Sequence, residues 1–230
     1  MQEVTKRRPG RPAGHHQPEE ETRALIVHAA AELFSRRGYA AVAIGDIAAA
    51  VGVTKATLYY HFSGKEAIYA EVMCWTLTEI AAGIRAIADA PEPIRARLLT
   101  LGHRALASAP PEANLDAMMR DVAEHLTPPL RLAVAGAHEA LLAAYDELMQ
   151  SGIARGELQP IAPRLLAHAF QHLLEAFVGV RGADFPDRAA AVTAAIELFL
   201  EGAAAREIAG SVGTNGHAGG GSLLRPCGER

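Results

Sequence analysis

The sequence predicts an all-α fold, with a three-helix head joined by one long helix to a helical body. The chain of 230 residues is 50% hydrophobic but only 5% aromatic and is rich in alanine and leucine, a composition typical of packed helices. Apolar residues recur at helical spacing in successive segments, and no strand-like alternation is found. Prolines and glycines separate these segments, so we expect many helices.

These breaks predict four regions along the chain. We expect a flexible basic arm over residues 1–20, the head over residues 21–66, the body over residues 67–206 and a disordered Gly-rich tail over residues 207–230. The first head helix is closed by Gly38. Its apolar stripe consists of Leu25, Ile26, Ala29, Ala30, Leu33 and Phe34.

Residues 43–65, AIGDIAAAVGVTKATLYYHFSGK, have the spacing of a helix-turn-helix. Gly52 can end a short first helix in the left-handed conformation, and Thr54 can cap a second helix that runs to about Tyr60. Ala48 is small where the helices would cross, and Leu58 would be the buried anchor of the second helix. The apolar face of the first helix is Ile44, Ile47, Ala48 and Val51.

The second helix of this motif exposes groups suited to base edges and phosphates. A solvated helix in a small bundle is the alternative, but the helix-turn-helix spacing favours DNA. Ser63 and Glu66 have the spacing of a capping box, which would begin the next helix and bring Lys65 near the DNA backbone. The exposed groups of the second helix are Thr54, Lys55, Thr57, Tyr59, Tyr60 and His61.

One long helix is expected from Ser63 to about Ala90, where Pro91 and Pro93 end it. We expect it to be the only rigid link between the head and the body. Further helices are predicted at about residues 94–108, 113–126, 128–154, 163–181 and 187–206.

The segment Thr57-Leu58-Tyr59-Tyr60-His61-Phe62, followed by Lys65-Glu66, resembles the signature of TetR-family (tetracycline-repressor-like) transcriptional regulators. The resemblance covers roughly residues 21–71. It implies a DNA-binding head on a ligand-binding body, acting as a homodimer whose operator binding is released by a small molecule. Other matching positions are Leu33-Phe34, Gly38-Tyr39, Ile44, Asp46-Ile47-Ala48 and Gly52-Val53-Thr54.

The resemblance also implies roles for single residues. Lys55 and Thr57 match base-contacting positions, whereas Tyr59, Tyr60, His61 and Lys65 match positions that touch or orient toward phosphate. Two positions depart from the family pattern. Ala43 stands where Ser or Thr is usual, and Gly45 stands where a longer polar residue is frequent, so we expect weaker phosphate contacts from the first helix of the motif.

The net charge is −4, but a sequence-specific dimer needs only a local positive face. Arg7, Arg8 and Arg11 cluster with Lys6 in the arm, where Gly10-Arg11-Pro12 resembles the core of an AT-hook. Beside a helix-turn-helix, this pattern favours an arm that enters the minor groove, with a solvated basic tail as the alternative.

No stretch is expected to be long and apolar enough to span a bilayer, and no apolar segment follows the charged amino terminus. We therefore expect a cytoplasmic protein with no membrane partner. Cys74 and Cys227 are expected to be reduced thiols, because neither has metal-ligand spacing. No cofactor and no metal are predicted.

Two apolar seams near the carboxyl end can pack on each other within one chain, or together pair with a second copy. The family resemblance implies a four-helix dimer interface. The candidate interface residues are Leu166, Phe170, Leu173, Leu174, Phe177, Val192, Ile196, Phe199 and Leu200.

Several body residues could line an effector cavity, although core packing explains each equally well. His168, His172 and Glu175 share a helix face that could hold a metal, but a further ligand is lacking and solvated histidines are the alternative. The candidate effector residues are Trp75, His103, Met118, Met119, His138 and Phe170.

No glycine-framed nucleophile turn and no phosphate loop is found, so an enzyme is not expected. The pattern favours a ligand-released dimeric repressor on a palindromic operator. A DNA-binding activator or architectural protein without an effector is the first alternative, and a helical enzyme or adaptor is the second.

Overall fold

The computed structural model describes residues 17–108, 115–177 and 185–203, and every regular element within these ranges is a helix. The all-α prediction is therefore confirmed. The helices are α1 (Gln17–Ala41), α2 (Ile44–Val51), α3 (Lys55–His61), α4 (Lys65–Ala88), α5 (Ile94–Ser108), α6 (Leu115–His125), α7 (Pro128–Ala154), α8 (Pro163–Phe177) and α9 (Arg188–Ala203). Arg7, Arg8, Arg11 and Cys227 lie outside the described residues.

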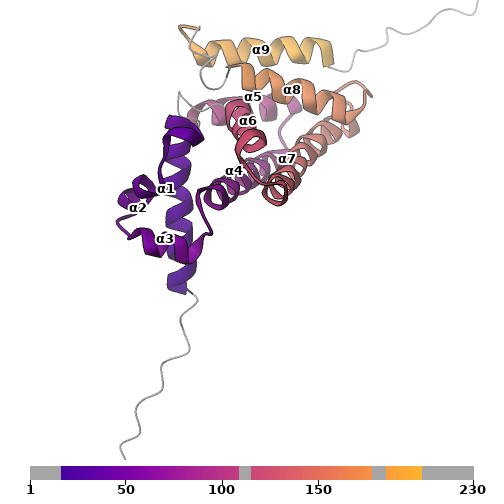
Figure 1. Ribbon diagram of the computed structural model, residues 1–230. Coiled ribbons are helices and arrows are strands. Elements are labelled where there is room, and N and C mark those ends of the chain that lie inside the picture. The colour runs from indigo at the N-terminus through magenta and orange to yellow at the C-terminus, as the bar shows by residue number, and fades with distance from the viewer. Residues whose placement is uncertain (1–16, 109–114, 178–184, 204–230) are drawn as a thin grey trace, which may run out of the picture.

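Helices α1, α2 and α3 gather into a head at one side of the larger group formed by α4 to α9 (Figure 1). The head has its own apolar contacts, because Ile26 and Phe34 of α1, Ile47 of α2 and Leu58 of α3 are each at most 1% exposed. Gly38 interrupts α1 with a φ of +74°, a left-handed conformation that favours glycine. The predicted end of the first helix is thus observed.

The helix-turn-helix has the predicted local structure. Gly52 closes α2 with a φ of 77°, and its backbone N–H donates to the carbonyl of Ala48. Thr54 caps α3, since its side chain accepts a hydrogen bond from the Thr57 backbone N–H at 3.1 Å. The short turn therefore fixes the direction of α3 relative to α2.

Helices α4 and α7 form the centre of the body and run in the same direction. Near their beginnings, the Glu66 carboxylate accepts a hydrogen bond from the Thr127 backbone N–H. Near the end of α4, Arg85 pairs with Glu147 at 3.0 Å. The predicted capping box at Ser63 is wrong, because Gly64 is the N-cap of α4 and Glu66 instead bonds the residue before α7.

Among the described helices, α4 is long and apolar enough, by length and composition alone, to cross a membrane, contrary to the sequence expectation. Its most apolar window is 44% buried within the protein. Because α4 packs against α1, α5, α6 and α7, its apolar side chains serve the core of this fold. The six that are at most 1% exposed and largest are Ile68, Tyr69, Val72, Met73, Leu77 and Ile84.

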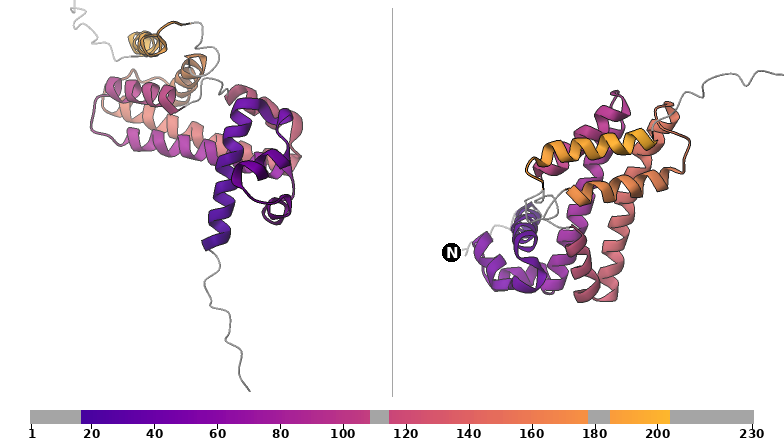
Figure 2. Two further views of the ribbon diagram at one scale, coloured as in Figure 1. Left: turned by 90° about the vertical axis from the view of Figure 1, so that its left-hand side faces the viewer. Right: turned by 90° about the horizontal axis from the view of Figure 1, so that it is seen from above.

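Helices α8 and α9 lie side by side across the end of the body that is remote from α3 (Figures 1 and 2). α8 packs on α7, and α9 packs on α5. The predicted bounds of the helices at residues 94–108 and 128–154 are observed. The predicted helices at residues 113–126, 163–181 and 187–206 are observed as α6, α8 and α9, and their remaining ends fall largely on residues that are not described.

Gly102 sets the close approach of α5 to α9, because a Cβ there would lie 2.6 Å from Ile196 Cδ1 and 2.9 Å from Val192 Cγ1. We expect Gly102→Ala to destabilise the protein by about 1–3 kcal/mol through overpacking, measured by urea unfolding. Gly136→Ala is the matched control, because its Cβ would meet nothing within 4 Å. The control should be neutral or stabilising by about 0.5–1 kcal/mol, so equal effects would contradict this account of the α5–α9 contact.

Candidate DNA-binding surface and its links to the body

Helix α3 presents the row of side chains that the sequence predicts for DNA. Lys55 is exposed, and Tyr59 and Tyr60 are 56% and 71% exposed. Thr57 and His61 are half-buried, and Leu58 on the opposite side is only 1% exposed. The helix is therefore anchored by one face and offers the other to solvent.

The hydroxyl groups of Thr54 and Thr57 are hydrogen-bonded to each other. Their hydroxyl oxygens are 2.9 Å apart, and the Thr54 oxygen already accepts from the Thr57 backbone N–H. Only one of the two hydroxyls can donate within the pair, so the other hydrogen remains for an outside acceptor. This arrangement suits a base edge or a phosphate.

Tyr60 is held by a residue that the sequence analysis did not single out. Its hydroxyl donates to Glu19 of α1 at 2.8 Å, and this hydrogen bond raises the pKa of Tyr60. The ring also packs edge-on against His61, with centroids 5.1 Å apart. Glu19 lies 41 residues away in sequence, which no local pattern could reveal.

The carboxyl end of α3 is fixed by Arg23 of α1. The Arg23 guanidinium lies 4.3 Å from the centre of the Phe62 ring, donates to the His61 carbonyl at 3.0 Å and pairs with Glu71 of α4 at 3.0 Å. One side chain thus connects α1, the end of α3 and α4. The pairing was missed because a single arginine in a first helix has no distinctive spacing.

Lys65 has a structural partner within the head. Its Nζ lies 3.4 Å from the Ala40 carbonyl oxygen and 4.2 Å from the centre of the Tyr39 ring. Burial is the main cause that lowers the pKa of Lys65. The phosphate role expected for Lys65 stays a prediction, and replacing Lys65 would also disturb the junction of α1 and α4.

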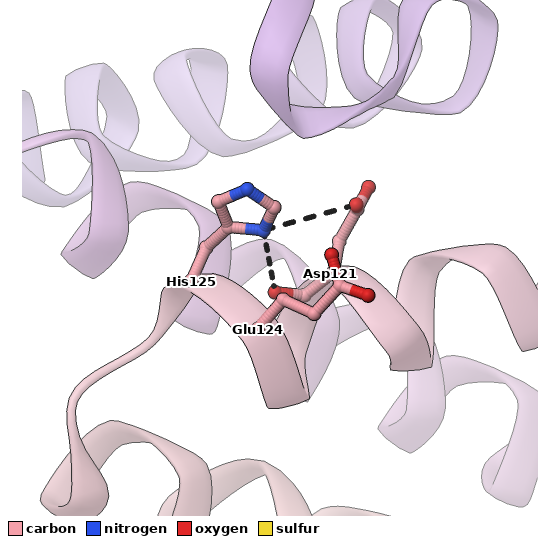
Figure 3. A group of neighbouring side chains, drawn as sticks. All are labelled: Asp121, Glu124 and His125. Carbon is pink, nitrogen blue, oxygen red and sulfur yellow. Dashed lines mark hydrogen bonds and ion pairs between the residues drawn. The ribbon is translucent and has the colours of Figure 1, made fainter.

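A second link between head and body runs through α6. The Asp121 carboxylate accepts a hydrogen bond from the Tyr39 backbone N–H at 3.1 Å, directly after the left-handed Gly38. The His125 ring packs on the Tyr39 ring at 4.7 Å, and its Nδ1 donates to the Asp121 carbonyl (Figure 3). Because α6 holds the head directly, the expectation that the long helix is the only rigid link is wrong.

Asp121, Glu124 and His125 also bring ligand atoms within 4.8 Å of one another on one turn of α6 (Figure 3). The Asp121 carboxylate already accepts a hydrogen bond from the Tyr39 N–H, so this member of the cluster has a structural role. The possible metal site considered from the sequence, His168, His172 and Glu175, lies on α8 and not on α6. There, His172 Nδ1 lies 2.9 Å from the Glu175 carboxylate, whose other oxygen accepts from Gln171.

The six predicted effector residues have different neighbours. Trp75 packs edge-on against His28 of the head at 4.4 Å, and exposed His103 bonds Thr193 of α9 at 3.0 Å. Phe170 is fully buried, Met118 is 8% exposed, and Met119 and His138 are half-buried. Their role in effector binding stays a prediction.

The predicted dimer residues pack largely within one chain, which is the alternative that the sequence pattern left open. Leu173, Phe177 and Phe199 are half-buried. Since the seam is filled by α5, α7, α8 and α9 of the same chain, most of its side chains are inaccessible to a second copy. The buried members are Leu166, Phe170, Leu174, Val192, Ile196 and Leu200, each at most 7% exposed.

Comparisons with known proteins agree with this geometry. Residues 26–72 match the family described as bacterial regulatory proteins, tetR family. The transcriptional regulator AcrR of Shigella flexneri is 40% identical over 27% of the chain, and the activator FasR of Mycolicibacterium smegmatis is 37% identical over 33%. IcaR of Staphylococcus aureus, a negative regulator of a biofilm operon, is 48% identical over 19%. These matches span 28%, 35% and 24% of the relatives' own lengths.

The likeness to solved structures extends over the body. A TetR-family transcriptional regulator of Mesorhizobium loti is 26% identical, with a TM-score of 0.62 over 81% of this chain and 98% of its own. A transcriptional regulator of Saccharomonospora viridis in complex with choline is 22% identical, with a TM-score of 0.66 over 81% of this chain and all of its own. Residues 26–72 thus match the tetR family of regulatory proteins, and the chain shares its overall fold with solved transcriptional regulators of that family.

The Asp121 link can be tested without DNA. We expect Asp121→Ala to destabilise the protein by about 1–3 kcal/mol and to speed hydrogen exchange at the Tyr39 amide, because that N–H loses its acceptor. Asp121→Asn keeps an oxygen acceptor and should have a smaller effect. Glu124→Ala is the control, being an exposed acid on the same turn. Unchanged exchange at Tyr39 in Asp121→Ala would refute the link.

Proposed function

We propose that the protein is a homodimeric repressor that binds a palindromic operator through α3 and leaves it when a small molecule binds the body. The observation that supports this proposal is the exposed polar face of α3. The helix is fixed by the Thr54 cap at its start and by Arg23 at its end. Lys55 and Thr57 would contact bases, whereas Thr54, Tyr59, Tyr60, His61 and Lys65 would contact or orient toward phosphates. Arg7, Arg8 and Arg11 would add an arm in the minor groove.

The homodimer is supported by the outer faces of the last two helices. Leu165 of α8 and Leu198 of α9 are 61% and 69% exposed, although both are large apolar side chains. A second copy packed there would bury them, together with the half-buried Leu173, Phe177 and Phe199. A two-fold dimer would present two copies of α3, as a palindromic site requires.

The relatives include both a repressor and an activator of transcription. IcaR is a negative regulator and FasR is an activator, so an activator remains the second candidate. The likeness to the choline complex supports a body that accepts a small organic molecule. Such a ligand would weaken operator binding by its differential affinity for two arrangements of the heads. We place the protein in the cytoplasm, where its DNA would be.

Replacement of Lys55 tests the DNA-binding assignment. We expect Lys55→Met to reduce discrimination at particular base pairs by about 1–3 kcal/mol, because a base contact is lost. The operator is first selected from genomic fragments, and affinities are then measured by mobility shift at fixed salt. Arg120→Met, an exposed charge on α6, is the matched control and should not alter base preference. If wild-type protein selects no fragment, the proposed function fails.

Trp75 offers a test of ligand release. Because its ring packs on His28 of α1, we expect an effector that shifts the head relative to α4 to change the emission of this single tryptophan. The compound should also dissociate the operator complex, and operator DNA should weaken its binding by the same factor. A compound that binds equally well with and without operator would not be the effector, whatever its effect on Trp75.

A further inference from the structure

Gly45 and Lys55 meet where α2 and α3 lie next to each other. A Cβ at position 45 would lie 3.0 Å from Lys55 Cε, which is closer than most Cβ contacts, and 3.4 Å from Lys55 Nζ. The end of the Lys55 side chain therefore lies against the bare backbone of the first turn of α2. Lys55 itself is the first residue of α3.

Backbone conformation does not explain this glycine. Gly45 lies inside α2, and its φ is not in the left-handed region, unlike those of Gly38 and Gly52. Glycine lowers helix stability relative to alanine at such a position. What glycine provides here is the space that Lys55 occupies.

The Lys55 ammonium lies beside Gly45 and has no acidic partner among the described residues. Lys55 has no hydrogen bond or ion pair with any described residue, and the side chain is exposed. Gly45 thus leaves room for the end of the Lys55 side chain beside α2, and the three N–H donors of the ammonium remain available to an acceptor outside the chain.

We infer that Gly45 is a specificity-determining residue, because its missing side chain lets Lys55 lie across α2 and so sets which base pair Lys55 contacts. The inference rests on the proposed function of α3 in DNA binding. A Cβ at position 45 would push Lys55 Cε away by a few tenths of an ångström and would bring Nζ to the limit of ordinary contact. Displacement is cheap for the fold, since only the end of a flexible side chain moves, but base hydrogen bonds tolerate little change in distance.

The first arm of the test needs no DNA. Nuclear Overhauser effects between Gly45 Hα and Lys55 Hε protons should be observed in the wild-type protein, and Gly45→Ala should shift the Lys55 Cε resonance. The thermal midpoint of Gly45→Ala should be unchanged or raised, which excludes unfolding as the cause. Absence of the Gly45–Lys55 contact in solution would overturn the inference.

The second arm is a selection from randomised duplexes with wild type, Gly45→Ala, Lys55→Met and the double variant. We expect Gly45→Ala to change relative base preference at least threefold at the position that Lys55→Met also affects, and to have no further effect in the Lys55→Met background. Gly83→Ala in α4, whose Cβ would meet nothing within 4 Å, should match wild type.

The outcomes separate the two claims. If wild-type protein enriches no sequence, the proposed function fails and the role of Gly45 fails with it. If wild type enriches an operator but Gly45→Ala has the same preference, or shifts preference equally with and without Lys55, only the inference about Gly45 is overturned.

Discussion

Burial of α4 is the constraint on which the rest of the structure depends. Its first half contacts α1 of the head through Tyr69 and Trp75, and interactions near both of its ends connect it to α7. At its far end, buried Arg97 of α5 donates to the Ala88 carbonyl and to Ser151 of α7, which ties the ends of the two central helices together. Movement of either end of α4 would therefore also move the helices packed against it. The position of the head depends on this packing, because α1 contacts α4.

The orientation of α3 depends on contacts behind it rather than on α3 itself. With seven residues, α3 is too short to be stable as an isolated helix. The Thr54 cap begins it, Leu58 anchors it, and Arg23 holds its last carbonyl and the Phe62 ring. Exposed Lys55 and Tyr59 are not needed to hold the helix in place, whereas Thr54 and Tyr60 also make hydrogen bonds within the head.

Local spacing made the helix-turn-helix predictable. The glycine at the turn, the threonine cap and the buried Leu58 each depend on neighbours within a few residues, and all three are observed. The body helices were also predictable, because prolines and glycines mark their ends. By contrast, Arg23 reaches residues 38 and 48 positions away, and Asp121 reaches one 82 positions away, so sequence spacing alone could not reveal either contact.

The apolar faces of α8 and α9 show a second reason why some contacts could not be predicted from the sequence. Apolar periodicity identifies which face of a helix is buried but not what buries it. The seam of α8 is covered by α7 and α9 of the same chain, and the exposed leucines lie elsewhere on the helices. The failed capping box has a related cause, since Glu66 had a better partner in Thr127, a residue 61 positions away.

Two connections to the head also constrain how an effector could act. A tilt of α4 alone would stretch the bond between Asp121 and Tyr39 and the contact between Trp75 and His28. A charge-assisted hydrogen bond contributes about 1.5–3 kcal/mol, whereas typical allosteric coupling is about 1–3 kcal/mol. Breaking this link would therefore consume about as much free energy as coupling supplies. A ligand that moves α4 and α6 together would keep the hydrogen bond between Asp121 and Tyr39 intact. Coupled motion of these two helices is therefore the energetically favourable way to transmit ligand binding from the body to α3.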